Sequence, residues 1–272
     1  MAYVPRGVAM NTAREMLARL PFLLLVAVTL TTAPGGCAKT TRPGDLARVR
    51  AGSDQPRAGN AYLLRGFIGV FSAGVDELSR AINASGVRAH VYQDDQWPAL
   101  ARRIRDEYAR ASAHEAEPLV LVGHSYGADD VIRIARELDE AGIAVDLLVT
   151  LDPVTPPPVP KNVRHALNIY QSNGVWDRLP WLRGVPVRHE RGASGRLENF
   201  DVRVDRRDLL SPGANHFNIE KQPQVHEEVV GYVLTTCPPR RTWLASRGID
   251  RTPRQSVDDY ADAQTAGHRR GK

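Results

Sequence analysis

The sequence predicts an α/β domain built on a mostly parallel sheet of about six strands flanked by helices, and three observations support this class. Predicted strands and helices alternate strictly from residue 61 onward, which is typical of right-handed βαβ units. The predicted strand 119–122 is apolar throughout, as expected of a parallel strand covered on both faces. It runs into a sharp turn, after which apolar residues recur at helical spacing.

Ordinary start and stop signals bound these elements. Pro98 stands near the first turn of the second helix, and Gly86 and Gly142 follow the first and third helices, where a C-terminal cap belongs. Apolar patterns place the strands at 61–64, 87–92, 119–122, 145–151, 163–170 and 200–204, and mark the helices over 75–82, 97–111, 131–138 and 223–234.

Composition divides the 272-residue chain into four parts. Residues 1–37 resemble an export signal, because a basic stretch precedes the apolar run 22–30 and small residues follow it. That run is shorter than the about 20 apolar residues of a membrane-spanning helix. The segment 38–58 is interpreted as a flexible linker, 59–237 as the folded domain, and 238–272 as a disordered basic tail.

Two cysteines leave the state of the N-terminus open. Cys37 follows two glycines, which resembles the end of a bacterial lipoprotein signal, although Pro34 stands where such signals usually have an aliphatic residue. A plain cleaved signal and an uncleaved anchor are the alternatives to lipidation of Cys37. In an oxidising envelope Cys37 could instead pair with Cys237. We expect an exported protein, in the periplasm or anchored as a lipoprotein of a bacterial cell envelope.

The net charge of +5 does not indicate a nucleic-acid partner. The two ends of the chain hold 16 of the 36 basic residues but only 7 of the 31 acidic ones, so the segment 59–237 has 20 basic and 24 acidic residues. A nucleic-acid footprint would cluster basic residues on the folded domain. The mildly acidic domain therefore excludes this class of function.

The clearest chemical signature is G-H-S-Y-G at 123–127. Ser125 lies at the apex of the predicted strand-to-helix turn, with Gly123 and Gly127 on either side. A serine at such an elbow has a strained backbone, and bulky flanking residues would clash with it. An ordinary turn serine between two glycines is the alternative, but it would not require this strand and helix. Ser125 is our candidate nucleophile.

A serine hydroxyl needs a base that is itself held in orientation, and in this class the chain order is serine, acid, histidine. His216 is the candidate base, because it lies in the turn-rich loop 211–217 between the last predicted strand and the last helix. His124, next to the nucleophile, should point into the sheet. The other downstream histidines are less suitably placed. His165 lies at a strand start, His189 in a polar stretch and His226 within a predicted helix.

Two residues compete for the role of the acid. Asp152 ends the fourth predicted strand and precedes Pro153, so its side chain should emerge at the catalytic edge of the sheet. Asp177 follows the next strand, which is the commoner location for this acid. We favour Asp152 and keep Asp177 as the alternative. Asp129 and Asp130 open the elbow helix, where they meet its dipole favourably, and are interpreted as structural.

Acyl transfer also requires donors for the developing oxyanion. The backbone N–H of Tyr126, directly after the nucleophile, should supply one. The second should come from the loop after the first strand, where Phe67 is suitably placed and Gly66 and Gly69 allow close approach. These glycines would also suit a simple tight turn.

Taken together, G-H-S-Y-G at 123–127, R-G-F at 65–67, T-L-D-P at 150–153 and N-H-F at 215–217 resemble the α/β-hydrolase superfamily, in its lipase, esterase and thioesterase-like group. The L-D-P acid is similar to that of pancreatic-type lipases and chlorophyllases. The resemblance implies a serine hydrolase that cleaves carboxylic ester or thioester bonds through a Ser125–Asp152–His216 triad and an acyl-enzyme. The domain departs from the family pattern because it is compact, with about six strands, no evident first pair of strands and little room for a large lid domain. Arg65, where many relatives have histidine, departs from the pattern.

No metal or organic cofactor is expected, and the expected partner is a small-molecule or lipid ester, with a possible membrane tether through the N-terminus. Two alternatives stay open: an envelope acyltransferase that uses the same triad, and a catalytically silent binding protein with the same fold.

Overall fold

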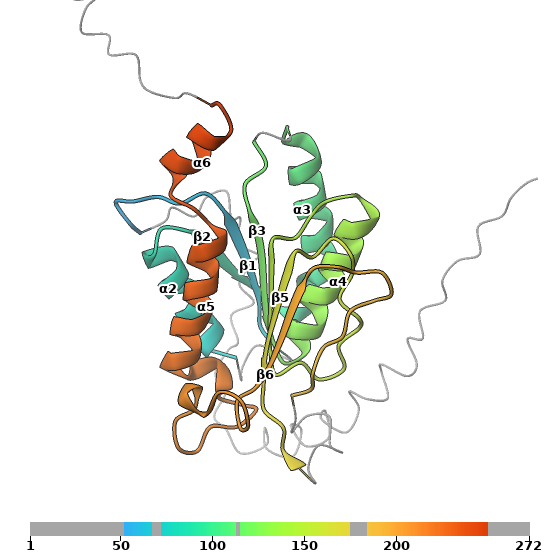
Figure 1. The fold of residues 1–272 in the computed structure, drawn as a ribbon, viewed down its shortest axis with the longest axis vertical. Helices are drawn as coiled ribbons and strands as arrows, with labels where there is room; N and C mark the ends of the chain where they lie inside the picture. The colour runs from blue at the N-terminus through green and yellow to red at the C-terminus, as the bar shows by residue number, and fades with distance from the viewer. Residues whose placement is uncertain (1–51, 67–71, 113–114, 175–183, 250–272) are drawn as a thin grey trace, which may run out of the picture.

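A computed structural model describes residues 52–66, 72–112, 115–174 and 184–249. Six strands form one all-parallel sheet in the order β2-β1-β3-β4-β5-β6 (Figure 1). The strands are β1 (Asn60–Leu64), β2 (Arg88–Tyr92), β3 (Leu119–His124), β4 (Leu147–Leu151), β5 (His165–Tyr170) and β6 (Arg196–Asp201). With helices on both faces, this is consistent with a compact α/β-hydrolase fold, so the predicted fold class is confirmed.

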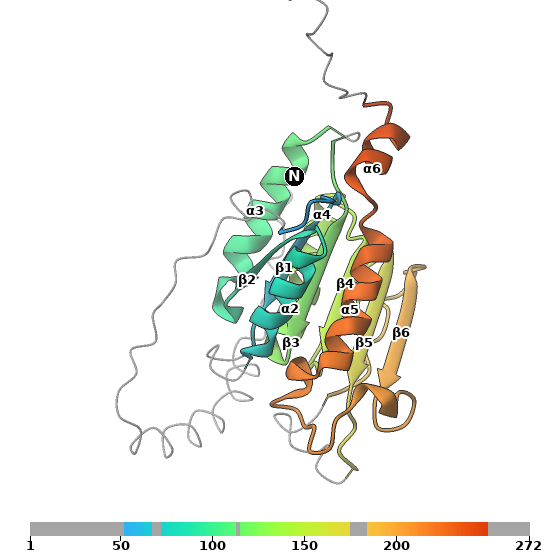
Figure 2. The same ribbon diagram turned by 90° about the vertical axis from the view of Figure 1, so that its left-hand side faces the viewer.

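The helices divide between the two faces of the sheet (Figure 2). One face is covered by α2 (Gly74–Ala84) and α5 (Pro223–Thr236), and the other by α3 (Trp97–Arg110) and α4 (Tyr126–Glu140). A further helix, α6 (Arg240–Ser246), follows α5. Short 3₁₀ helices are η2 (Asp94–Gln96), η5 (Arg207–Leu209) and η6 (Ile219–Lys221).

The central strand β3 is buried along its whole length between β1 and β4. Because successive side chains of a strand point to opposite faces, β3 contributes to both halves of the core. Val120 and Val122 pack toward α2 and α5, whereas Leu119 and Leu121 pack toward α3 and α4. An uninterrupted apolar sequence is what this position demands, and it explains why the strand was predictable.

All six strands run in the same direction, so their carboxyl ends meet at one edge of the sheet. The residues that follow β1, β3, β4 and β5 at this edge are Arg65, Ser125, Asp152 and Gln171. The opposite edge holds the two ends of the described chain, where Arg57 and Pro239 form an antiparallel bridge. The fold thus separates a chemically rich edge from a structural one.

The last strand differs from the prediction. Residues 200–204 were predicted as a strand, but β6 covers Arg196–Asp201 and the chain turns after it, with Val204 N–H donating to Asp201 O at 2.9 Å. β6 is an edge strand and contains charged residues: Arg196 is exposed, and the partly buried Glu198 pairs with His165. It therefore lacks the apolar pattern of a buried strand.

The predicted linker and tail also differ from the structure at their inner ends. Residues 240–246 form α6, and Trp243 is buried there. Ala58 N–H donates to Pro238 O at 3.0 Å, so both segments pack onto the domain. The remaining tail and the predicted export signal, with Cys37, lie outside the described residues. Within those residues, no helix is both long and apolar enough to cross a membrane.

Candidate active site

Ser125 joins β3 to α4 in a conformation that serine rarely adopts. Its φ of 57° and ψ of −124° lie outside the main allowed regions. Its N–H donates to the carbonyl of Leu151 at 2.9 Å, which ties the turn to β4. This is the strained strand-to-helix elbow that brings a nucleophile out at the carboxyl edge of a sheet.

The two glycines of the elbow are required sterically. A Cβ at Gly123 would overlap the carbonyl of Gly127, and a Cβ at Gly127 would overlap the carbonyl of Arg65. The first turn of α4 therefore packs directly against β3 and against the loop after β1. Any larger residue at either position would push the helix away from the sheet and displace Ser125.

The structure brings Ser125, His216 and Asp152 together from three separate loops. Ser125 Oγ lies 3.0 Å from His216 Nε2, and His216 Nδ1 lies 3.3 Å from Asp152 Oδ2. A carboxylate accepts, so Nδ1 carries the proton and Nε2 is free to accept the serine proton. The exposed fractions are 8% for Ser125, 5% for His216 and 0% for Asp152. Little water therefore surrounds Ser125 and His216, the two residues that would exchange the proton.

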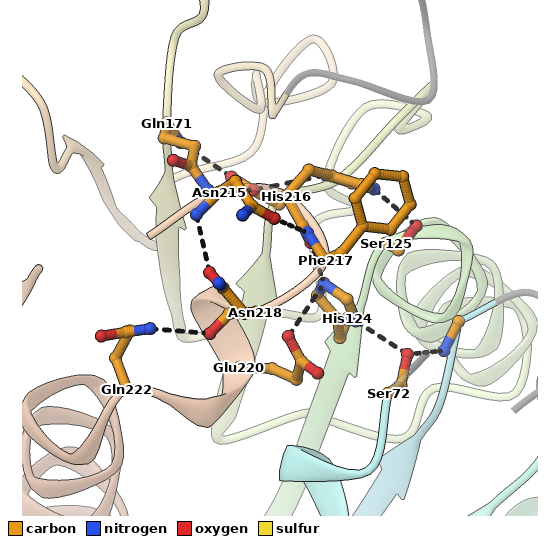
Figure 3. Close-up of polar contacts among 12 residues, drawn as sticks. Ser72, His124, Ser125, Gln171, Asn215, His216, Phe217, Asn218, Glu220 and Gln222 are labelled. Atoms are coloured by element: carbon orange, nitrogen blue, oxygen red, sulfur yellow. Dashed lines mark hydrogen bonds and ion pairs between the residues drawn. The ribbon is translucent and has the colours of Figure 1, made fainter. Parts of the chain in front are cut away.

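His216 is held by hydrogen bonds within its own loop (Figure 3). Asn218 Oδ1 accepts from Asn215 N–H at 2.7 Å, and Asn215 Oδ1 accepts from Phe217 N–H at 2.9 Å. Side-chain acceptors of this kind stabilise turns without regular secondary structure. The loop lies between β6 and α5, as the sequence predicts.

Gln171 is a functional candidate that sequence reasoning missed. Asp152 Oδ1 accepts from Gln171 N–H at 2.7 Å, and Asp152 Oδ2 accepts from Gln171 Nε2 at 3.0 Å. These bonds orient the carboxylate toward His216. The only sequence signal is that Gln171 directly follows β5, so that it ends beside the end of β4.

Asp129, which the sequence analysis interprets as a structural residue at the start of a helix, also supports the loop that carries Asp152. Its carboxylate accepts hydrogen bonds from Val154 N–H at 3.0 Å, Thr155 N–H at 2.9 Å and Thr155 Oγ1 at 3.1 Å. Burial raises the pKa of Asp129 to about 6, although these donors favour the charged form. The loop that begins with Asp152 is thereby attached to the first turns of α4.

The proposed oxyanion donors are only partly described. Tyr126 is the first residue of α4, and N–H groups of a first helical turn have no acceptor within the helix. Phe67 lies outside the described residues, as does the alternative acid Asp177. The loop after β1 does pass close to the nucleophile, because a Cβ on Gly66 would lie 2.8 Å from Ser125 Cβ.

The remaining downstream histidines lie away from Ser125. His165 Nε2 is 2.6 Å from Glu198 Oε1, between β5 and β6. His189 forms an isolated bridge with Val159, and His226 Nε2 contacts the carbonyl of Glu220 at 2.6 Å. His216 is thus the downstream histidine that the described structure places against the candidate nucleophile.

No family model and no curated protein matches the sequence. Similar solved structures include Est1E from Butyrivibrio proteoclasticus, at 17% identity and a TM-score of 0.29 over 39% of this chain and 44% of that one. A cutinase-like protein from Cryptococcus sp. is 15% identical, with a TM-score of 0.41 over 69% and 97% of the two chains. The type II thioesterase BorB from the borrelidin cluster is 15% identical, with a TM-score of 0.37 over 72% and 97%.

The chain therefore spans less than half the length of Est1E but almost all of the other two proteins. At such identities and TM-scores its function has to be inferred from its own site. The fold and the site together define an α/β protein in which a serine, a histidine and an aspartate are linked by hydrogen bonds at the carboxyl edge of a parallel sheet.

Proposed function

We propose that this protein is a serine hydrolase that cleaves carboxylic ester or thioester bonds. The observation that carries the proposal is the hydrogen-bonded series from Ser125 Oγ through His216 to Asp152 Oδ2. It begins at a strained elbow, where a serine needed only for folding would have no reason to be. This arrangement supplies the three roles that acyl transfer to a serine requires.

The proposed reaction has two halves. Ser125 Oγ attacks the carbonyl carbon while His216 Nε2 takes its proton, and Asp152 stabilises the imidazolium that forms. The N–H of Tyr126, with that of Phe67, holds the oxyanion. Protonated His216 then gives its proton to the leaving alcohol or thiol, which leaves an acyl-enzyme. Water, deprotonated by His216, hydrolyses this ester and restores Ser125.

Covalent labelling with a fluorophosphonate, followed by intact mass, tests the nucleophile. We expect one adduct on the wild type and none on Ser125→Ala or His216→Ala. His165→Ala is the matched control, because this histidine pairs with a carboxylate away from the site, and it should label like the wild type. A folded wild type that takes up no label would refute the hydrolase.

Replacement of each candidate acid, Asp152 or Asp177, by its amide tests which of them is the third member of the proposed triad. Asp152→Asn should slow hydrolysis of an activated ester by about 10³–10⁴-fold, because His216 would lose the charge that stabilises its imidazolium. Asp177→Asn should retain the wild-type rate. The opposite ranking would transfer the role of acid to Asp177. Ester and thioester substrates of graded acyl length, with and without an added alcohol, then distinguish a hydrolase from an acyltransferase.

A further inference from the structure

A second polar cluster lies behind the proposed triad and is not used by the mechanism. It consists of Ser72, two residues before α2, His124, at the end of β3, and Glu220, in η6 (Figure 3). All three side chains are buried, with relative exposures of 2%, 2% and 0%. A histidine and a carboxyl group at this depth require a structural or functional reason.

The hydrogen bonds of His124 determine where its proton resides. His124 Nε2 lies 3.0 Å from the backbone carbonyl of His216, and a carbonyl only accepts, so Nε2 carries the hydrogen. His124 Nδ1 lies 2.8 Å from Ser72 Oγ, which itself accepts from Gly66 N–H at 3.0 Å. The hydroxyl of Ser72 is thus free to donate to Nδ1. Burial lowers the pKa of His124 to about 3, in agreement with a neutral ring.

Glu220 supports the same protonation state from below. Its Oε2 lies 3.6 Å from His124 Nε2. Burial raises the pKa of Glu220 to about 8, against smaller opposite effects of a backbone hydrogen bond and of the charge of Lys221, and this favours the uncharged form at neutral pH. An ionised Glu220 would compete for the hydrogen on Nε2, whereas the neutral form leaves Nε2–H donating to the carbonyl of His216.

We propose that His124 is a positioning residue for the reaction proposed above, on which this inference rests. Its ring fixes the main chain of His216 on one side and, through Ser72, the backbone of Gly66 on the other. One residue therefore supports the loop of the base and the loop expected to supply an oxyanion donor. It is also the neighbour of Ser125, so all three parts of the site share one buried support.

The contact acts on the catalytic histidine itself and not only on the core around it. Asp152 orients the imidazole of His216, but the height of that ring above Ser125 depends on the main chain, which His124 holds. The rings of His124 and His216 also lie near each other, with centroids 5.6 Å apart and planes tilted by 36°. A displacement of about 1 Å in such a group costs about 100-fold in rate.

Two isosteric replacements separate the bonds of His124. In His124→Gln the amide nitrogen reaches the place of Nε2 and can still donate to the His216 carbonyl. In His124→Asn the shorter amide reaches only the place of Nδ1, so it keeps Ser72 and loses His216. We expect kcat per titrated serine to fall about 10- to 100-fold in the asparagine variant, with KM unchanged. In the glutamine variant, which keeps the His216 carbonyl and loses only the bond to Ser72, kcat should fall by no more than about 3-fold.

Asn162→Ala is the matched control for a loss of stability. Its amide donates to the carbonyls of Ala135 at 2.9 Å and Ile143 at 2.7 Å near the amino edge, so its loss should lower the melting temperature without changing kcat. For each variant, the rate of reaction with the fluorophosphonate is divided by the fraction of protein that takes up the label. Equal rates for wild type and His124→Asn, or equal losses in both His124 variants, would overturn the inference while leaving the hydrolase intact.

A second measurement does not require a folded variant. Long-range ¹⁵N–¹H correlation spectra of the wild type should show His124 as the neutral Nε2–H tautomer throughout pH 5–8, where an ordinary histidine titrates. The Nδ1–H tautomer, which has no hydrogen on Nε2 to donate to the His216 carbonyl, would overturn the proposal. Failure of the wild type to label at all would refute the proposed function and the positioning role together.

Discussion

Ser125 and Asp152 share a left-handed backbone, with φ of 57° and 47°. Every other described residue with positive φ is glycine. Such a conformation costs a residue with a side chain about 1–3 kcal/mol, so neighbouring strands must hold it in place. Ser125 N–H donates to Leu151 O at 2.9 Å, and Asp152 N–H donates to Ile169 O at 3.0 Å. The strain at both positions supports the roles proposed for Ser125 and Asp152.

At the same scale, Glu220 should make stability depend on pH. Its pKa is raised from 4.5 to about 8 in the folded chain, so between these values the folded state binds more protons than the unfolded one. Stability due to this group is present below pH 4.5 and is lost as pH rises toward 8. Glutamine at this position does not titrate. The unfolding free energy of Glu220→Gln minus that of the wild type should therefore increase with pH, by at most about 1.4 kcal/mol per pH unit.

Urea unfolding at pH 5 and pH 8.5 measures this difference. The opposite trend of His124, whose pKa is lowered to about 3, is common to both proteins and cancels. Glu227→Gln, on the exposed side of α5, controls for the chemistry of the replacement. A wild-type-to-variant difference that is the same at both pH values would show that Glu220 is ionised when folded.

At the scale of elements, the packing of α4 on the sheet should depend on the glycine of its first turn. Gly127→Ala would place a methyl group against the backbone carbonyls of Arg65 and Leu64, neither of which is a flexible side chain. Overpacking of this kind costs about 1–3 kcal/mol, and here it also displaces Ser125. We expect lower stability by chemical denaturation together with loss of fluorophosphonate labelling.

Gly231→Ala supplies the matched comparison. Gly231 lies inside α5, and a Cβ there would meet no atom within 4 Å. Alanine should therefore stabilise the protein by about 0.5–1 kcal/mol through helix propensity and leave labelling unchanged. If both variants lost stability equally, the cost at Gly127 would be a general effect of replacing glycine and not a clash at the elbow.

Elements that carry their own signal were predictable from the sequence. The buried strand β3 requires an apolar run, and the elbow requires small residues on both sides of Ser125. Asp152 and His216 were found because parallel strands end at one edge, where the loops after β4 and β6 must meet. Chain order and strand direction were sufficient for these residues.

What the sequence did not predict depends on contacts between distant segments. Gln171 reaches Asp152 because β4 and β5 pair in register, with Leu151 opposite Ile169, and no local pattern encodes that. The role of Asp129 depends in the same way on the loop after β4. β6 was misplaced because its edge position allows charged residues, which hide a strand pattern.

At the scale of the whole molecule, the folded unit extends beyond the predicted 59–237 at both ends. Gly52 N–H donates to Asn83 O at 3.0 Å at the C-terminus of α2, and α6 continues the chain beyond α5. Both segments lie at the amino edge of the sheet, opposite Ser125 (Figure 1).

Glu117 joins these segments to the sheet, and its replacement should affect stability without affecting catalysis. The carboxylate is 8% exposed and accepts from Gly59 N–H at 2.9 Å, from Arg88 at 3.0 Å and from Arg240 at the start of α6. Glu117→Gln would leave an amide N–H group facing these donors. Because the two arginines are partly exposed, we expect unfolding free energy to fall by about 2 kcal/mol, which is less than for a fully buried pair.

Urea denaturation and kcat per labelled serine, measured on the same preparations, test this separation of the two edges. Glu77→Gln is the control, since Glu77 is exposed and its oxygen lies 3.9 Å from Arg80, a surface pair whose loss should cost less than about 1 kcal/mol. Because Glu117 lies at the edge of the sheet opposite Ser125, kcat per labelled serine should equal that of the wild type in both variants. A fall in kcat with Glu117→Gln alone would mean that the amino edge supports the site as well as the fold.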